Sequence, residues 1–122
     1  AYIGTRDTTI SGSRTGFTVM GLWYAIHTLG MEGMRARLEK SIDLARYAER
    51  TFREAGIDAK RNKNALTVVF SRPDETVCDK WQLAVAGDIA HIVCMPHLRK
   101  EQIDALLEDI LASQQPETGM IA

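Results

Sequence analysis

A long run of apolar residues at helical spacing constrains the fold of this chain more than any other feature. Over residues 32–55 apolar residues recur at steps of three and four positions, and arginines and acids fill the positions between them. The apolar positions are Met34, Leu38, Ile42, Ala45, Ala48, Phe52 and Ala55. One face of such a helix packs on a core and the other meets water. Gly56 is expected to end the helix in a left-handed conformation.

An earlier segment, residues 17–29, predicts a helix of a different kind. Its apolar residues lie on most sides of the helix rather than on one stripe, and a helix of this kind is usually buried between other elements. Gly30 offers a stop signal. We expect Trp23 to be a core residue, and Met20 and Met31 to pack in a core or at an interface. This helix therefore needs a surface to pack on that the rest of the chain does not supply.

Short β-branched and aromatic runs after Gly56 predict a small sheet. We expect a strand near residues 57–61, a polar turn at 62–64 and an antiparallel partner strand at 65–71. A third strand is expected at 89–95, where Pro96 would stop it.

Two further helices are expected among these strands. Pro73 and the acids after it would open the first, which Gly87 would end. Its expected buried stripe is Val77, Trp81, Ala84 and Val85. The second covers residues 100–112. The order of elements predicts an α+β fold, in which a small antiparallel sheet is covered by helices.

The composition excludes several classes of function. The 122 residues carry a formal net charge of -1, so the chain has no basic excess for a phosphate backbone or an anionic membrane surface. We expect neither nucleic acid nor a membrane as a partner, and no apolar stretch approaches transmembrane length. The length suits a single compact domain.

The cysteines and the N-terminus indicate the origin of the chain. Cys78 and Cys94 show no paired spacing, so both are expected to be free thiols in a reducing compartment, the cytoplasm. The chain begins at Ala1 without a methionine, and without the basic start or apolar run of a signal peptide. This start indicates a fragment of a longer protein, or a processed chain.

A metal site at His91, Cys94 and His97 is suggested by their even spacing, but the strand geometry disfavours it. Residues three apart on a strand point to opposite faces, so His91 and Cys94 cannot easily share an ion. We interpret them instead as a core or domain-interface histidine, a buried thiol and a surface histidine. No metal is expected.

Three stretches together resemble one protein family. They are Asp7 to Arg14 with Gly16 and Leu22-Trp23-Tyr24; Thr67 to Phe70 with Arg72-Pro73; and Lys80 to Ala84 with Gly87, Ile89-Ala90-His91, Val93 and Met95-Pro96. Their order and spacing resemble the C-terminal end of group II pyridoxal-phosphate (PLP) decarboxylases, in the histidine decarboxylase and serine decarboxylase branch. The resemblance runs from Tyr2 to about Leu111.

The resemblance implies the aspartate-aminotransferase fold (PLP fold type I), a dimer, and a large domain that holds PLP through a lysine Schiff base. That lysine lies upstream of Ala1 in the family, and none of the lysines of this chain sits in such a motif. The expected divisions are an active-site loop region (1–16), a buried connecting helix (17–30), the C-terminal small domain (31–113) and a flexible tail (114–122).

The resemblance also implies which residues handle the substrate. Arg14 matches an arginine that takes the substrate carboxylate, for which a planar guanidinium is suited; a structural salt bridge is the alternative. Ser13 would face the substrate side-chain pocket, or else act as a turn or capping serine. Tyr2 would be a general acid that protonates the carbanion.

The expected function is therefore that of an L-amino-acid decarboxylase, with histidine as substrate and histamine and CO2 as products. Serine is the second candidate substrate. Phe17 departs from the histidine often found after Gly16 in the family, which leaves the substrate open. Without the cofactor lysine the isolated chain is expected to be inactive and to need the large PLP-binding domain as its partner. The alternative is a stand-alone, non-catalytic domain that self-associates through the helix at 17–29.

Overall fold

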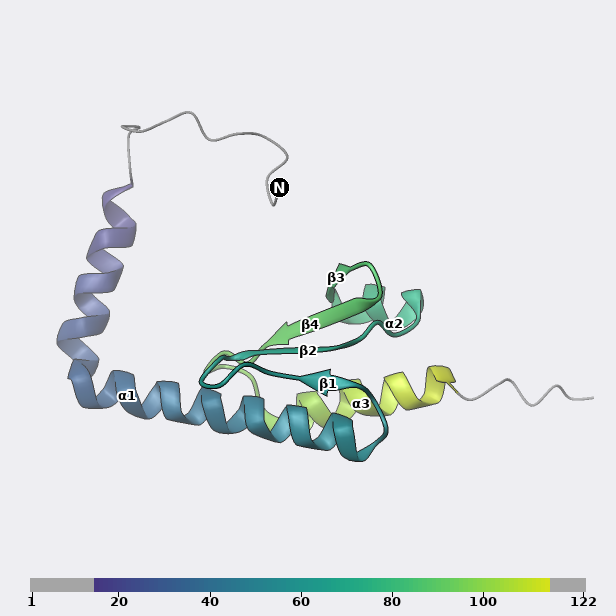
Figure 1. Cartoon of the computed structure of the whole chain (residues 1–122). Helices are drawn as coiled ribbons and strands as arrows, with labels where there is room; N and C mark the ends of the chain where they lie inside the picture. Colours follow the sequence, from purple (N-terminus) through teal and green to yellow (C-terminus); the bar gives the residue numbers. More distant parts are fainter. Residues whose placement is uncertain (1–14, 115–122) are drawn as a thin grey trace, which may run out of the picture. The chain divides into compact units, whose positions relative to one another are not determined.

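A computed structural model describes residues 15–114 of the chain. Its elements, in order, are α1 (Gly16–Glu54), β1 (Ala59–Lys60), β2 (Thr67–Ser71), α2 (Glu75–Trp81), β3 (Ala84–Ala86), β4 (Ile89–Val93) and α3 (Lys100–Gln114), as Figure 1 shows. The chain divides into two units between Met34 and Arg35, and each is described by itself. No helix among residues 15–114 is long and apolar enough to cross a membrane.

The first unit contains the start of α1, which covers the helix predicted over residues 17–29. Gly30 has non-helical torsion angles (φ 60°, ψ −176°) and interrupts α1 where a stop was predicted, although the helix resumes directly. The apolar side chains of this unit are exposed: Phe17, Val19, Met20, Leu22, Trp23, Tyr24, Ile26 and Met31. The expectation that Trp23 is a core residue is wrong for this part of the chain, because 58% of its surface is exposed.

The second unit is built on a four-stranded antiparallel sheet with the order β1-β2-β4-β3. In the register of β2 and β4, Phe70 lies opposite Ala90, and Val69 lies opposite His91. Because side chains alternate along a strand, Phe70 and Ala90 share the buried face, and Val69 and His91 share the other. The α+β class with a small antiparallel sheet is therefore confirmed.

The core lies between one face of this sheet and the helices. The Phe52 ring of α1 meets the Phe70 ring of β2 edge-on, with ring centroids 5.0 Å apart, an arrangement that aromatic pairs prefer. Ile103, Leu106 and Ile110 of α3 join the same core. The buried residues of α1 are Ser41, Leu44, Ala45, Ala48 and Phe52. Met34 and Leu38, which the periodicity placed on the buried stripe, are exposed.

The helix expected from Pro73 to Gly87 is wrong in its second half. α2 ends at Trp81 because Gln82 is left-handed (φ 49°). The Gln82 N–H bonds to the Asp79 carbonyl and the Leu83 N–H to the Cys78 carbonyl, the bond pattern of a Schellman motif. Ala84 and Val85 are then exposed strand residues rather than part of a helical stripe.

β3 and β4 form a hairpin that the sequence reading missed. Ala86 pairs with Ile89, so Gly87 and Asp88 make a two-residue loop. Gly87 has a positive φ of 58°, which two-residue hairpin loops require at this position. A glycine-aspartate pair between short apolar runs is a hairpin signal, and here it is the correct one.

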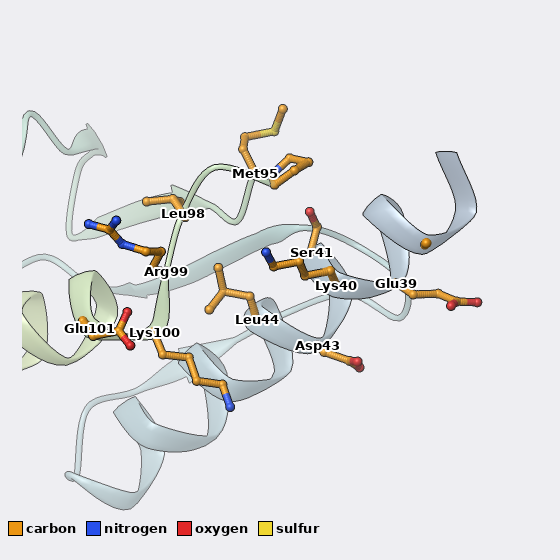
Figure 2. Close-up of a pocket in the computed structure, with 12 residues that line it drawn as sticks. Glu39, Lys40, Ser41, Asp43, Leu44, Met95, Leu98, Arg99, Lys100 and Glu101 are labelled. Carbon is orange, nitrogen blue, oxygen red and sulfur yellow. The ribbon is translucent and has the colours of Figure 1, made fainter. Parts of the chain in front are cut away.

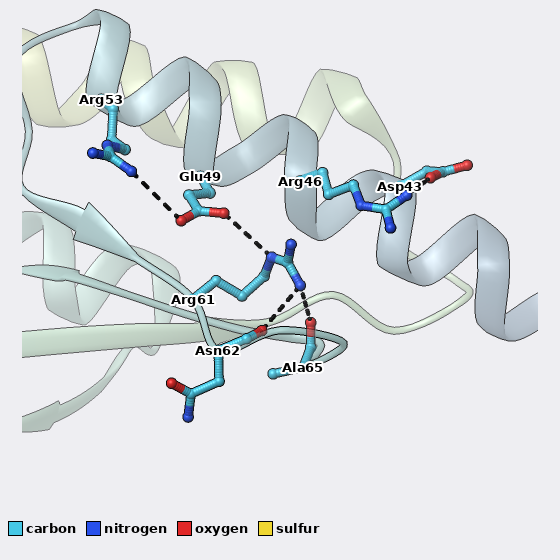
Figure 3. A network of polar contacts seen from close by, with 7 residues as sticks. All are labelled: Asp43, Arg46, Glu49, Arg53, Arg61, Asn62 and Ala65. Atoms are coloured by element: carbon cyan, nitrogen blue, oxygen red, sulfur yellow. Dashed lines mark hydrogen bonds and ion pairs between the residues drawn. The ribbon is translucent and has the colours of Figure 1, made fainter.

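Arg61, which is largely buried, connects the turn between β1 and β2 to α1. Arg61 Nε lies 3.4 Å from Glu49 Oε2, and its side chain is 10% exposed. The same guanidinium donates to the carbonyls of Asn62 and Ala65. Figure 3 shows Glu49 between Arg61 and Arg53. The predicted turn at 62–64 is thus held by a charged side chain beneath it.

Candidate functional site

The residues predicted to handle substrate lie outside the part of the chain that the structure describes. Tyr2, Ser13 and Arg14 all precede residue 15, and so does most of the loop region at 1–16. The tail predicted from 114 onwards also lies almost wholly outside it. The roles of Tyr2, Ser13 and Arg14 therefore stay predictions.

The lysines test whether this chain could hold PLP by itself. A lysine that forms a Schiff base must act as a neutral nucleophile, and proteins achieve this by taking the amine out of water. All the lysines of the chain lie in the described residues, and each is exposed. Lys80 is also tied to Asp109 at 2.7 Å, and the Lys100 ammonium lies 4.9 Å from the centre of the Tyr47 ring. The residues 15–114 do not fit the cofactor.

The three evenly spaced residues near β4 are separated by the fold. Cys94 is fully buried, and burial raises the pKa of its thiol to about 11. His91 is half-buried on the opposite face of the sheet, and His97 is exposed. Cys78 is a second buried free thiol. Among residues 15–114 no three His, Cys, Asp or Glu side chains are grouped to hold a metal ion.

A cavity of about 650 Å³ lies between α1 and residues 95–101. Leu44, Met95 and Leu98 give it apolar walls, and Ser41 and charged residues of both signs also line it: Glu39, Lys40, Asp43, Arg99, Lys100 and Glu101. In Figure 2, α1 lies on one side and the segment leading into α3 on the other. Both sides of this cavity come from the second unit.

Ser41 is the polar residue that the sequence reading missed. It is 1% exposed, and its Oγ has no hydrogen-bond partner within the described structure. The periodicity placed Ile42 on the buried stripe, but the buried positions are Ser41, Leu44, Ala45 and Ala48. A serine at helical spacing with buried leucine and alanine is the sequence signal that could have identified it.

Comparisons with known proteins give relatives over nearly the whole chain. It is 43% identical over 120 residues to the histidine decarboxylase of Vibrio campbellii, which covers 98% of this chain and 31% of that protein. It is also 43% identical over 114 residues to serine decarboxylase 3 of Oryza sativa subsp. japonica, covering 93% of this chain and 26% of that protein. The chain thus spans less than a third of the length of these relatives.

Solved structures are also similar to this chain. L-methionine decarboxylase from Streptomyces sp. 590, in complex with L-methionine methyl ester, matches 93% of this chain and 25% of its own with a TM-score of 0.72 at 31% sequence identity. A second structure of this enzyme gives a TM-score of 0.71. No protein-family model matches the chain.

Proposed function

We propose that this chain, which is homologous to the C-terminal part of group II PLP-dependent amino-acid decarboxylases, is the C-terminal part of a longer decarboxylase that converts histidine to histamine and CO2. One observation carries the proposal. A histidine decarboxylase aligns with 98% of this chain while the chain covers only 31% of it. Further histidine decarboxylases, from Morganella morganii and Pseudomonas fluorescens, align at 45% and 42% identity.

We propose that this chain and the rest of the protein have different roles, because residues 15–114 contain no lysine suited to a Schiff base. The cofactor and its lysine would therefore come from the rest of the protein. PLP, when bound there, supplies the electron sink for decarboxylation. This chain would supply Arg14 to bind the substrate carboxylate, Ser13 to face the substrate side chain and Tyr2 to donate a proton to the carbanion.

The proposed domain organisation assigns a partner to each part of the chain. Residues 17–30 would be the helix that connects to the large PLP-binding domain, and residues 31–113 the small domain. A homodimer in the cytoplasm is the expected assembly. Buried free thiols at Cys78 and Cys94 suit a reducing compartment.

A chimera tests the proposal. The matching segment of the Vibrio campbellii histidine decarboxylase would be replaced by this chain, and CO2 release would be measured with histidine, serine and methionine. We expect turnover of histidine. A chimera that is soluble and binds PLP but decarboxylates serine and not histidine would overturn the substrate assignment. A chimera of that quality that decarboxylates none of the three would overturn the function.

The role of Arg14 has its own test in the same chimera. Arg14→Ala should lower kcat/KM for histidine by about 100-fold, because two charged hydrogen bonds to the carboxylate are lost. Arg46→Ala is the matched control, since Arg46 is exposed and pairs only with Asp43 in the next turn of the same helix. An unchanged kcat/KM in Arg14→Ala would remove Arg14 from the site.

The second candidate is a non-catalytic domain that self-associates. The observation that favours it is the row of exposed apolar side chains on α1, which includes Phe17 at 83% exposure. Such a patch drives association when nothing else covers it. Sedimentation velocity over a range of concentrations would detect the oligomer. Lysine-linked PLP, fixed by borohydride in the isolated chain, would instead contradict both proposals.

A further inference from the structure

We propose that the cavity between α1 and residues 95–101 binds a small carboxylate that has an apolar body, with Lys40 Nζ and Ser41 Oγ as its polar contacts. The cavity holds about 650 Å³, which is in the size range of small-molecule sites. The proposal does not rest on the decarboxylase assignment, and it concerns residues other than those proposed to handle the amino-acid substrate.

The Ser41 hydroxyl is the first reason to expect a ligand here. Buried polar groups are almost always hydrogen-bonded, and leaving one without a partner is costly. Ser41 Oγ is one of two buried side-chain polar atoms in residues 15–114 that have none. The other, Arg61 Nε, still faces the Glu49 carboxylate at 3.4 Å. Ser41 belongs to the cavity lining, and its Oγ is covered by its neighbours, so these would have to move aside for a bound acceptor to satisfy it.

Lys40 gives the site its charge. Figure 2 shows its ammonium reaching from α1 towards the segment that carries Leu98 and Arg99, while the carboxylates of Glu39 and Asp43 point away from that segment. Asp43 is paired with Arg46 at 2.9 Å. No ion pair found within residues 15–114 uses Lys40. An incoming carboxylate would therefore find a cation that is not already neutralised.

The opposite side of the cavity adds weaker support. α3 begins at Lys100, and the first N–H groups of a helix have no acceptor within the helix and carry partial positive charge. Glu101, the acid in this first turn, stays on the α3 side of the cavity in Figure 2, across from Lys40. The Lys100 ammonium is engaged with the Tyr47 ring, so Lys40 remains the main positive contact.

A second hollow adjoins the first and explains why the ligand should be amphipathic. It has a volume of about 440 Å³ and is lined by Arg37, Lys40, Pro96 and His97, with no acid among them. Lys40 and Pro96 belong to both hollows. Lys40 therefore stands between a basic hollow and one with the apolar walls of Leu44 and Leu98, which suits an acid group joined to an apolar body.

Nuclear magnetic resonance of the 15N-labelled chain tests the site with benzoate as the probe and benzamide as its uncharged counterpart. Benzoate should shift the backbone amide resonances of Lys40, Ser41, Leu98 and Arg99 in a saturable manner, and benzamide should not. The absence of shifts with benzoate, shifts spread evenly over the chain, or equal binding of benzamide would each overturn the proposal.

Three variants assign the contacts. Lys40→Met should raise the Kd for benzoate about tenfold, and Ser41→Ala by a smaller factor of about three, because a charged contact is worth more than a hydroxyl. Lys63→Met, at an exposed lysine remote from the cavity lining, should leave the Kd unchanged. A Lys40→Met Kd equal to that of the unaltered chain, with its other resonances in place, would overturn the assignment.

Discussion

Two phenylalanines on the same helix have opposite environments. Phe17, near the start of α1, is 83% exposed, whereas Phe52, near its end, is fully buried against Phe70. The difference follows the apolar pattern around each residue. Around Phe52 the apolar residues form one stripe, which the sheet and α3 cover. Around Phe17 they lie on most sides, and one sheet face cannot cover them all.

Residues 35–114 form a core of their own, whereas residues 16–31 do not. Residues 35–114 bury a continuous cluster that includes Phe52, Val68, Phe70, Leu106 and Ile110. Residues 16–31 leave their large side chains exposed. An exposed helix that is apolar on most sides supports the proposal that another domain covers it, and this chain spans less than a third of the length of its relatives.

The largest effect on stability is expected when the two phenylalanines are each replaced by alanine. Phe52→Ala should lower the free energy of unfolding of the isolated chain by about 3–5 kcal/mol, because it leaves a cavity in the core. Phe17→Ala should change it by less than about 0.5 kcal/mol, since an exposed side chain loses little on truncation. Urea unfolding followed by circular dichroism measures both. Equal losses would remove the distinction between the two regions.

The second prediction concerns the contact of Arg61 with Glu49, which joins the turn after β1 to α1 within residues 35–114. Arg61→Ala should cost about 2–3 kcal/mol, because two backbone carbonyls lose their donor and the half-buried Glu49 carboxylate keeps only the exposed Arg53 as a partner. Arg46→Ala, which removes an exposed pair with Asp43, should cost less than about 0.5 kcal/mol. The same urea experiment compares them. A loss at Arg46 as large as that at Arg61 would show that burial does not decide the strength of these pairs.

The third prediction concerns the one buried serine of α1. Ser41→Ala should leave stability unchanged or raise it by about 1 kcal/mol, because it removes a buried hydroxyl without a partner. Ala48→Ser, which buries a new hydroxyl on the same stripe, is the reverse control and should lower stability. A clear loss of stability in Ser41→Ala would mean that the hydroxyl has a protein partner and would weaken the case for the cavity as a binding site.

The smallest effect should be a pH-dependent one at the contact between α2 and α3. Asp109 accepts hydrogen bonds from Lys80 and from the Trp81 indole, and these contacts hold the pKa of its carboxyl below the ordinary value. A carboxylate whose pKa is lowered in the folded state makes its full contribution to stability above its unfolded pKa of about 3.9. This contribution is lost as the pH falls through the folded pKa. The stability difference between the unaltered chain and Asp109→Asn should therefore shrink between pH 6 and pH 2. A difference that grows on acidification would contradict this.

Periodicity predicted the helices well where one stripe meets one core. The helix at 32–55 and the antiparallel pairing of β1 with β2 are confirmed. β3 was missed because α2 ends at Trp81 and the left-handed residue after it is Gln82, a residue type that rarely adopts this conformation, instead of a glycine. A cap formed by such a residue depends on backbone bonds that residue patterns do not reveal.

The candidate site also has parts that the sequence could predict and parts that it could not. The expectation that no lysine here holds the cofactor stays a prediction. The cavity at Ser41 could not be predicted, because its two sides come from residues more than fifty positions apart in the chain and their approach depends on tertiary packing. The roles of Arg14, Ser13 and Tyr2 rest on the family resemblance and stay predictions.

Hydrogen–deuterium exchange tests the difference between the two halves of α1 most directly. Peptides covering residues 16–31 and 41–52 would be compared by mass spectrometry, in the isolated chain at a concentration where it sediments as a monomer and in the chimera with the Vibrio campbellii enzyme. We predict fast exchange at 16–31 and slow exchange at 41–52 in the isolated chain, and slow exchange at both in the chimera. Equally slow exchange at 16–31 in the isolated monomer, or fast exchange there in a folded chimera, would contradict the proposal that the rest of a longer decarboxylase covers this helix.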